Sequence, residues 1–147
     1  QAHSGHSYNM WRMADENPKV MSPALQALER FGLAGRGDVP VAELAHGERR
    51  QLELAMAVVT EPKLLLLDEP LAGMSKFESE SIVALLTELK RHYSILLVEH
   101  DMDAVFALAD RVTVLVYGKA IASDEPLYIR QNSEVRKAYL GDEEEVI

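Results

Sequence analysis

The sequence predicts an α/β fold built on a mainly parallel sheet, and three observations support this prediction. Residues 64–67 and 95–98 form short, wholly apolar runs, which are typical of parallel strands covered on both faces. A segment with helical periodicity lies between them, and a third run with alternating valines follows at 112–116. This alternation of strand and helix favours right-handed crossovers and a largely parallel sheet.

The first third of the chain is predicted to be helical. Ser22 followed by Pro23 is typical of a helix start, and Gly32 is typical of a helix end. Apolar residues then recur at helical spacing over 52–59, which indicates a second helix. Residues 1–20 are polar and show no clear period, so we assign no structure to them.

The later elements follow from helix-start, turn and alternation signals. Ser75 lies three residues before Glu78, a capping-box pattern that predicts a helix running to Leu89. Tyr117-Gly118 predicts a hairpin turn after the strand at 112–116. Two short helices near 126–130 and 134–140 and an acidic end at 142–145 complete the chain.

Composition excludes several classes of protein. The 147 residues are 48% hydrophobic, enough for one real core, and 15 Lys+Arg against 24 Asp+Glu give a net charge of -9. Such a chain is not a general electrostatic binder of nucleic acid or anionic lipid. The absence of cysteine excludes disulfides and thiolate metal sites, and no apolar stretch approaches the ~20 residues that span a bilayer.

The most informative stretch runs from Leu64 to Pro70, where four leucines lead into the adjacent carboxylates Asp68 and Glu69. Ligands bind open α/β sheets at the carboxyl ends of strands, and His100 follows the second apolar strand. An aspartate that holds Mg²⁺ through water, a glutamate that deprotonates a water and a histidine that reaches a phosphate are suited to phosphoryl transfer. On these residues alone, an acidic turn and a structural histidine remain alternatives.

A third feature is Gly47, which precedes the helix predicted over 52–59. A glycine before a helix leaves free N–H groups at the positive end of the helix dipole, where an anion can bind. Most glycines in this position are only turns, so the order and spacing of all three features carry the argument.

Four segments together resemble an ATP-binding-cassette (ABC) ATPase, a branch of the P-loop NTPases, in its C-terminal part. Residues 44–48 match the signature motif Leu-Ser-Gly-Gly-Gln, 64–69 the Walker B strand and 72–75 the D-loop. His100 matches the switch histidine, and the resemblance covers about 22–141. Within the family, Val-Glu-His-Asp-Met at 98–102 and Lys-Ala-Tyr-Leu-Gly at 137–141 resemble the ATPase subunits of branched-chain amino-acid importers, whose close relatives serve urea or short amides.

The resemblance implies ATP and Mg²⁺ as cofactors. Asp68 would hold Mg²⁺ through water, Glu69 would polarise the attacking water, and His100 would contact the γ-phosphate. The positions that would meet the ATP of an opposite subunit or the dimer seam are Ala45, His46, Gly47, Glu48, Gly73 and Ser75.

The implied partners are a second ATP-binding subunit and transmembrane permease subunits. The protein would lie peripherally on the cytoplasmic face of the inner membrane, without inserting in it and without a nucleic-acid partner. A soluble ABC ATPase of DNA repair or translation and a non-hydrolytic interaction module are the alternative interpretations.

Several residues depart from the family pattern. Ala45 replaces the signature serine, and His46 replaces a glycine and would donate to phosphate in its place if protonated. Glu48 replaces glutamine, which puts a carboxylate where the helix dipole favours it but a nearby γ-phosphate does not. Ser75 stands where many members have aspartate.

The largest departure is that no Walker A sequence, Gly-x-x-x-x-Gly-Lys-[Ser/Thr], occurs in these residues. We therefore expect a fragment: residues 1–61 as part of the helical subdomain, 62–124 as the C-terminal half of the nucleotide-binding core, and 125–147 as C-terminal helices and acidic tail. Without the phosphate cradle, we expect these residues alone to be inactive and to expose sheet edges and apolar surface.

Overall fold

The computed structural model describes residues 18–140, and the side chains of residues 21–139. Contacts divide the chain after Val98 into two compact units, each of which is described by itself. The polar segment expected before residue 18 and the acidic end expected at 142–145 lie outside the described residues. The three-part division expected from the sequence stays a prediction.

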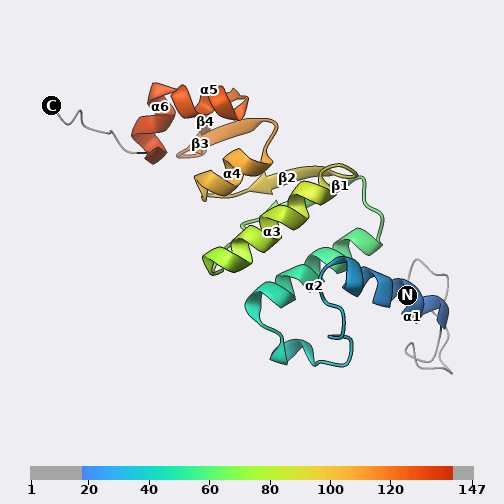
Figure 1. Cartoon of the computed structure of the whole chain (residues 1–147). Helices are drawn as coiled ribbons and strands as arrows, with labels where there is room; N and C mark the ends of the chain where they lie inside the picture. The colour runs from blue at the N-terminus through green and yellow to red at the C-terminus, as the bar shows by residue number, and fades with distance from the viewer. Residues whose placement is uncertain (1–17, 141–147) are drawn as a thin grey trace. The chain divides into compact units, whose positions relative to one another are not determined.

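The first unit alternates helices and strands. Helix α1 packs against α2, and α2 packs against α3 (Figure 1). Its elements are α1 (Pro18–Arg30), the 3₁₀ turn η3 (Val41–Glu43), α2 (His46–Val59), β1 (Leu64–Asp68), α3 (Lys76–Leu89) and β2 (Ser94–Val98).

Helix α1 differs from the expectation at its start and agrees with it at its end. Pro23 lies inside the helix rather than at its first position, so the prediction of a start at Ser22 was wrong. The C-terminus is a Schellman motif, because Gly32 donates to Glu29 O at 3.1 Å and Leu33 donates to Leu28 O at 2.7 Å. Gly32 adopts the required left-handed conformation, with φ 75°.

Strands β1 and β2 form the parallel pair that the apolar runs predict. They are in register from Leu64 opposite Ser94 to Asp68 opposite Val98. Only one face is covered, because Leu65 is 4% exposed while Leu66 is 69% exposed. The exposed apolar face comprises Leu64, Leu66, Leu96 and Val98. It corrects the expectation of strands covered on both faces and confirms the expected apolar surface.

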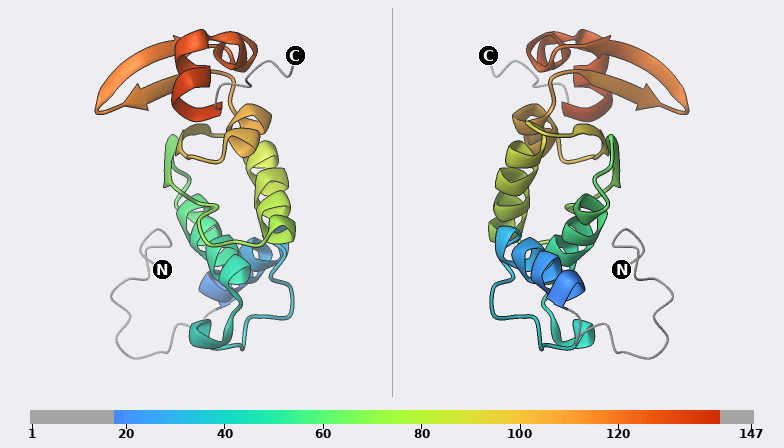
Figure 2. Two further views of the ribbon diagram at one scale, coloured as in Figure 1. Left: turned by 90° about the vertical axis from the view of Figure 1, so that its left-hand side faces the viewer. Right: turned by 90° about the vertical axis from the view of Figure 1, so that its right-hand side faces the viewer.

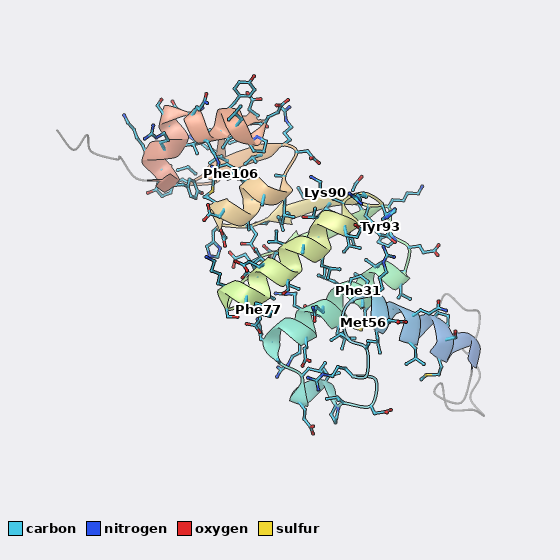
Figure 3. All side chains as sticks on the ribbon, viewed as in Figure 1. Phe31, Met56, Phe77, Lys90, Tyr93 and Phe106 are labelled. Carbon is cyan, nitrogen blue, oxygen red and sulfur yellow. The ribbon has the colours of Figure 1, made fainter. Side chains whose placement is uncertain are left out.

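The core of the first unit is mainly aliphatic and is supplied mainly by α2 and α3. Phe31, at the end of α1, is 2% exposed, and Figure 3 shows its side chain. The other deeply buried side chains are Leu33, Leu54, Ala55, Ile82, Leu86 and Leu89. In α3 the buried residues Ile82, Leu86 and Leu89 lie on the predicted inner face. In α2 the buried residues are Leu54, Ala55 and Val58, whereas Met56 is 59% exposed and Val59 is 47% exposed, so the inner face expected from the apolar residues over 52–59 was wrong there.

The second unit is built around an antiparallel hairpin, whose arms lie side by side in Figure 2. Tyr117 and Gly118 turn the chain with positive φ values of 48° and 75°, as the Tyr-Gly pair predicts. The elements are α4 (Met102–Leu108), β3 (Val112–Val116), β4 (Lys119–Asp124), α5 (Pro126–Gln131), α6 (Ser133–Val135) and the π-helical turn η4 (Arg136–Leu140).

The hairpin buries one face against the C-terminal helices. Val112 and Val114 of β3 form a core cluster with Ile129 of α5 and Val135 of α6. Arg130 lies 4.3 Å from the ring centroid of Phe106, a cation–π contact between α5 and α4. Valine alternation in β3 therefore marks the buried face, as the sequence predicts.

The Schellman motif gives a stability prediction. Gly32→Ala adds a Cβ that meets only Gln51 Nε2, at an ordinary 3.5 Å, so its cost comes from the positive φ. We expect a loss of about 1–2 kcal/mol in the free energy of unfolding, measured by urea denaturation.

The matched control is Gly37→Ala, whose Cβ makes ordinary contacts with Leu25 and Leu28. We expect this variant to be neutral or slightly stabilising, because alanine restricts the unfolded chain. Equal losses for the two variants would contradict the role assigned to Gly32.

Candidate functional site

The carboxyl ends of β1 and β2 bring a carboxylate pair to one edge of the sheet. Asp68 is the last residue of β1 and lies opposite Val98. The next residue, Glu69, donates its backbone N–H to Val98 O at 2.8 Å, which extends the ladder by one bond. Both acidic residues are exposed, so a ligand and water can reach them.

The backbone turns sharply at Glu69. Its φ of 44° lies in the left-handed region, which a residue with a side chain rarely adopts. Pro70, which follows, is buried and cannot donate a hydrogen bond. Backbone strain of this kind gathers at functional sites, so its place directly after Asp68 supports the interpretation of this strand end as a site.

The N-terminus of α2 carries the turn of residues 45–48, here named the signature turn. Glu48 accepts from the backbone N–H of Ala45 at 2.9 Å and from Arg36 Nε at 2.7 Å. The Ala45 N–H lowers the pKa of the Glu48 carboxyl below its ordinary 4.5; desolvation opposes this, and the hydrogen bond and charge of Arg36 lower it further. Glu48 therefore stays ionised and tied to the turn.

A second turn, residues 72–75, lies against the signature turn and is here named the D-loop turn. The Nε2 of His46 lies 3.1 Å from the carbonyl oxygen of Ala72, which can only accept, so Nε2 carries the hydrogen. Gly73, with φ 72°, lies beside the same imidazole: a Cβ there would be 3.7 Å from Nε2. His46 thus uses one ring nitrogen within the chain.

Glu78 connects the same two turns through its carboxylate. Its Oε1 accepts from the backbone N–H of Gly47 at 3.2 Å. Its Oε2 accepts from the N–H of Ser75 at 2.9 Å and from the Ser75 hydroxyl at 2.6 Å. The Ser75 contacts and then the Gly47 N–H lower the pKa of Glu78, against a smaller effect of desolvation. The predicted capping box at Ser75 is confirmed.

Arg50 ties α2 to the end of β1. Its Nε donates to Pro70 O at 3.1 Å, and one terminal nitrogen donates to Glu69 O at 3.4 Å. Its other terminal nitrogen pairs with Glu53 at 2.6 Å, which holds the guanidinium in place. The helix that carries the signature turn is therefore hydrogen-bonded to the strand end that carries Asp68.

His100 belongs to the second unit and is described within it. Its side chain is 70% exposed, and its Nδ1 lies 4.0 Å from Glu99 Oε2. Its backbone N–H donates to the same oxygen at 3.2 Å. Asp101, which follows, caps α4 by accepting from Asp103 N and Ala104 N, as the sequence predicts. The role assigned to His100 stays a prediction.

In the structure the predicted site residues of the first unit form two groups. Asp68 and Glu69 lie at the strand end, and Arg50 connects them to α2. The second group is Ala45, His46, Gly47, Glu48, Gly73 and Ser75. The chemical roles of both groups stay predictions.

The described residues fit a magnesium ion that keeps much of its water. No cluster of three His, Cys, Asp or Glu side chains suited to a metal occurs among them. Mg²⁺ in phosphoryl-transfer sites takes one or two carboxylates, with water and phosphate oxygens completing the octahedron. Asp68, exposed at the strand end beside Glu69, fits the part of a single carboxylate donor.

Three contacts were not found from the sequence. Arg36 lies in a loop without periodicity, and nothing in the sequence links it to Glu48 twelve residues later. Nothing in the sequence links Arg50 to the carbonyl oxygens of Glu69 and Pro70. Glu78 was recognised as a cap, but its second oxygen reaches Gly47 across 31 residues of sequence, which a local pattern cannot indicate.

Comparison with known proteins identifies the class. The ABC transporter family model matches residues 3–72. The ADP conformation of an ATP-binding cassette of an ABC transporter superposes with a TM-score of 0.75 at 27% identity, over 92% of this chain and 54% of that one. The structure of cbiO1 from Clostridium perfringens gives a TM-score of 0.71 at 32% identity, over 93% and 55%. The chain belongs to the ABC transporter ATP-binding domains.

Curated relatives narrow the similarity further. The high-affinity branched-chain amino acid transport ATP-binding protein LivG of Escherichia coli K12 is 42% identical over 126 residues, 84% of this chain and 49% of LivG. BraF of Pseudomonas aeruginosa, with the same description, is 36% identical over the same shares. The chain spans about half the length of these relatives.

Among the described residues, no helix has both the length and the apolar character needed to cross a bilayer.

The contacts of Glu48 predict a pH dependence of stability. Its pKa is lowered in the folded protein, so its contribution is fully present above the ordinary 4.5 and is lost as the pH falls through the folded-state value. We expect Glu48→Gln to unfold at lower urea than the wild type at pH 7 and the difference to shrink at pH 3.

Glu80→Gln is the matched control, since Glu80 is an exposed glutamate on α3. Its difference from the wild type should be small at both pH values. A Glu48→Gln difference that persists undiminished at pH 3 would contradict the assignment.

Proposed function

We propose that this chain is part of the ATP-hydrolysing subunit of an ABC importer. The observation that carries the proposal is the carboxylate pair Asp68-Glu69 at the carboxyl end of β1, in register with β2. The family match supports the ATP-binding class, and the signature turn at the N-terminus of α2 supplies the second element that such a site needs.

The strand end would perform the hydrolytic chemistry. Asp68 would hold Mg²⁺ through water, and the chemistry that the ion would supply is neutralisation of charge on the phosphate. Glu69 would orient and deprotonate the attacking water, which its exposed side chain allows. His100 would donate to the γ-phosphate and stabilise charge in the transition state.

The signature turn would serve the nucleotide of a second subunit. The N-terminus of α2 offers backbone N–H groups and the positive end of a helix dipole, which favour a phosphate. Gly47 would contact that γ-phosphate, with Ala45, His46 and Glu48 around it. Because Nε2 of His46 is used on Ala72 O, its phosphate donor would be Nδ1 of the protonated ring. Gly73 and Ser75 would lie at the seam between subunits.

Branched-chain amino acids are the proposed solutes, on the similarity to LivG and BraF. The subunit would pair with a second ATP-binding subunit and dock on permease subunits at the cytoplasmic face of the membrane. Uptake of labelled leucine by vesicles that hold the assembled transporter tests the solute. Uptake of urea in place of leucine would move the protein to the related urea and amide importers.

Glu69→Gln tests the hydrolytic role in a subunit that contains this chain and a phosphate-binding loop. We expect kcat for ATP hydrolysis to fall by about 10²- to 10⁴-fold, with ATP binding retained, because the amide cannot take the proton. Chelation of Mg²⁺ should abolish hydrolysis in the unsubstituted subunit.

The 147 residues alone should show no hydrolysis, since they contain no Gly-x-x-x-x-Gly-Lys-[Ser/Thr] sequence. Hydrolysis by these residues that disappears in Glu69→Gln would contradict this part of the proposal. Unchanged kcat in the Glu69→Gln subunit would contradict the role of Glu69 itself.

Glu48→Gln tests the contact with the second subunit. The Glu48 carboxylate repels a γ-phosphate bound at the signature turn, although Arg36 at 2.7 Å screens part of its charge. We therefore expect tighter ATP-driven dimerisation of Glu48→Gln subunits, measured by analytical ultracentrifugation with and without ATP. Equal or stronger dimerisation with Glu48 would sink this prediction.

A further inference from the structure

The hydrogen bonds of Glu78 give it a role beyond capping a helix. We propose that Glu78 is a positioning residue that couples the signature turn to the D-loop turn and holds the signature turn in place by accepting the Gly47 N–H. The coupling role rests on the proposed function, because it concerns the helix N-terminus that would meet the nucleotide of the second subunit.

Both oxygens of this carboxylate are used, and they are used on different turns. Oε1 accepts from Gly47 N at 3.2 Å, and Oε2 accepts from Ser75 N at 2.9 Å and Ser75 Oγ at 2.6 Å. The bond from Glu78 N to Ser75 Oγ, at 3.4 Å, completes the cap of α3. One side chain therefore connects Gly47 and Ser75, which are 28 residues apart in the sequence.

The chemistry of the bridge requires a carboxylate of this length. Two backbone N–H groups, one on each turn, need an acceptor, and a carboxylate offers an acceptor at each end. Glutamine offers one acceptor and one donor, so it must abandon Gly47 or Ser75. Aspartate keeps two acceptors but is one methylene shorter, so it can cap α3 without reaching Gly47.

The space at Gly47 is matched to this contact. Gly47 is buried, and a Cβ built on it would lie 3.1 Å from Glu78 Oε1 and 3.2 Å from Glu78 Cγ. Any larger residue would push the carboxylate away from the amide. Glycine at 47 and glutamate at 78 therefore depend on each other, and this dependence spans the two turns.

A second contact joins the same turns but cannot replace the bridge. His46 Nε2 donates to Ala72 O at 3.1 Å, through an exposed ring whose hydrogen bond competes with water. The Gly47–Glu78 bond is partly buried and charge-assisted, which makes it the stronger constraint. Glu78 borders a pocket of about 290 Å³ beside Phe77, which lies at the first turn of α3 in Figure 3.

The consequence concerns communication between subunits. Gly47 would feel the nucleotide of the partner, and the D-loop turn follows directly on the strand end with Asp68 and Glu69. A displacement of either turn changes the geometry at both ends of the Glu78 carboxylate. Loss of the bridge should therefore weaken the response to the partner's ATP more than the hydrolytic step.

The experiment compares Glu78→Asp and Glu78→Gln with Glu80→Asp and Glu80→Gln, which make the same chemical changes at an exposed position of α3. The first readout is the amide signal of Gly47 in ¹⁵N-labelled chain. The second is the ATP concentration for half-maximal hydrolysis and dimerisation in a subunit that contains this chain and a phosphate-binding loop. Urea unfolding of every variant reports loss of the cap.

We expect both Glu78 variants to move the Gly47 signal toward that of an amide bonded to water, and the Glu80 variants to leave it unchanged. The half-maximal ATP concentration should rise about tenfold, the loss expected for one hydrogen bond to a charged group, while kcat at saturating ATP stays within about twofold of the wild type. Glu78→Asp should unfold at a somewhat lower urea concentration than Glu80→Asp, because its cap remains but its bond to the buried Gly47 N–H is lost.

An unmoved Gly47 signal in both Glu78 variants overturns the bridge. A moved signal with the ATP dependence of the Glu80 controls overturns the coupling and leaves only a cap. Absence of ATP-driven dimerisation in the unsubstituted subunit overturns the proposed function and the coupling with it. That failure is distinguishable from the first, because the Gly47 signal then still responds to Glu78.

Discussion

The parallel pairing of β1 with β2 is the constraint on which the candidate site depends. In this register Asp68 lies opposite Val98, and the backbone bond from Glu69 to Val98 adds a further rung. Because the two strands are parallel, both end at the same edge of the sheet, and Glu69 follows β1 there. Arg50 of α2 donates hydrogen bonds to the carbonyl oxygens of Glu69 and Pro70, which follow β1. The position of the carboxylates therefore follows from backbone geometry, and both residues are exposed.

Charge at the signature turn is arranged in two opposite ways. Glu48 is paired with Arg36 and bonded to the Ala45 amide, so its negative charge is partly compensated inside the chain. Glu78 is stabilised by hydrogen-bond donors on the two turns, the Ser75 hydroxyl and N–H and the Gly47 N–H. An incoming phosphate at α2 would meet the partly compensated charge of Glu48, at a turn whose position depends on Glu78. The strength of nucleotide binding at such a turn depends on both carboxylates as well as on the helix dipole.

Local patterns predicted the elements well and the contacts between them poorly. The apolar runs of β1 and β2, the alternating valines of β3 and the Ser75 cap each depend on neighbours within a few residues, so periodicity reveals them. The start of α1 was misplaced because Ser22-Pro23 has the composition of a helix start although Pro23 lies inside the helix. The Glu78–Gly47 and Arg36–Glu48 bonds join residues far apart in sequence. One sequence contains no signal for them, since each depends on how α2, α3 and their loops pack.

The exposed apolar face of β1 and β2 has a consequence for how mutations in this chain are read. Its four side chains are each at least half exposed, so replacing one of them removes little burial within the chain. Any surface that covers this face would bury those same side chains, and a polar replacement would then carry the full cost of desolvation. The cost of a polar substitution at Leu66 or Leu96 therefore depends on what covers this face in an assembly. The cost at Leu86 or Leu89 depends only on packing within the chain. The two groups of leucines are therefore under different constraints, although a hydropathy profile treats them alike.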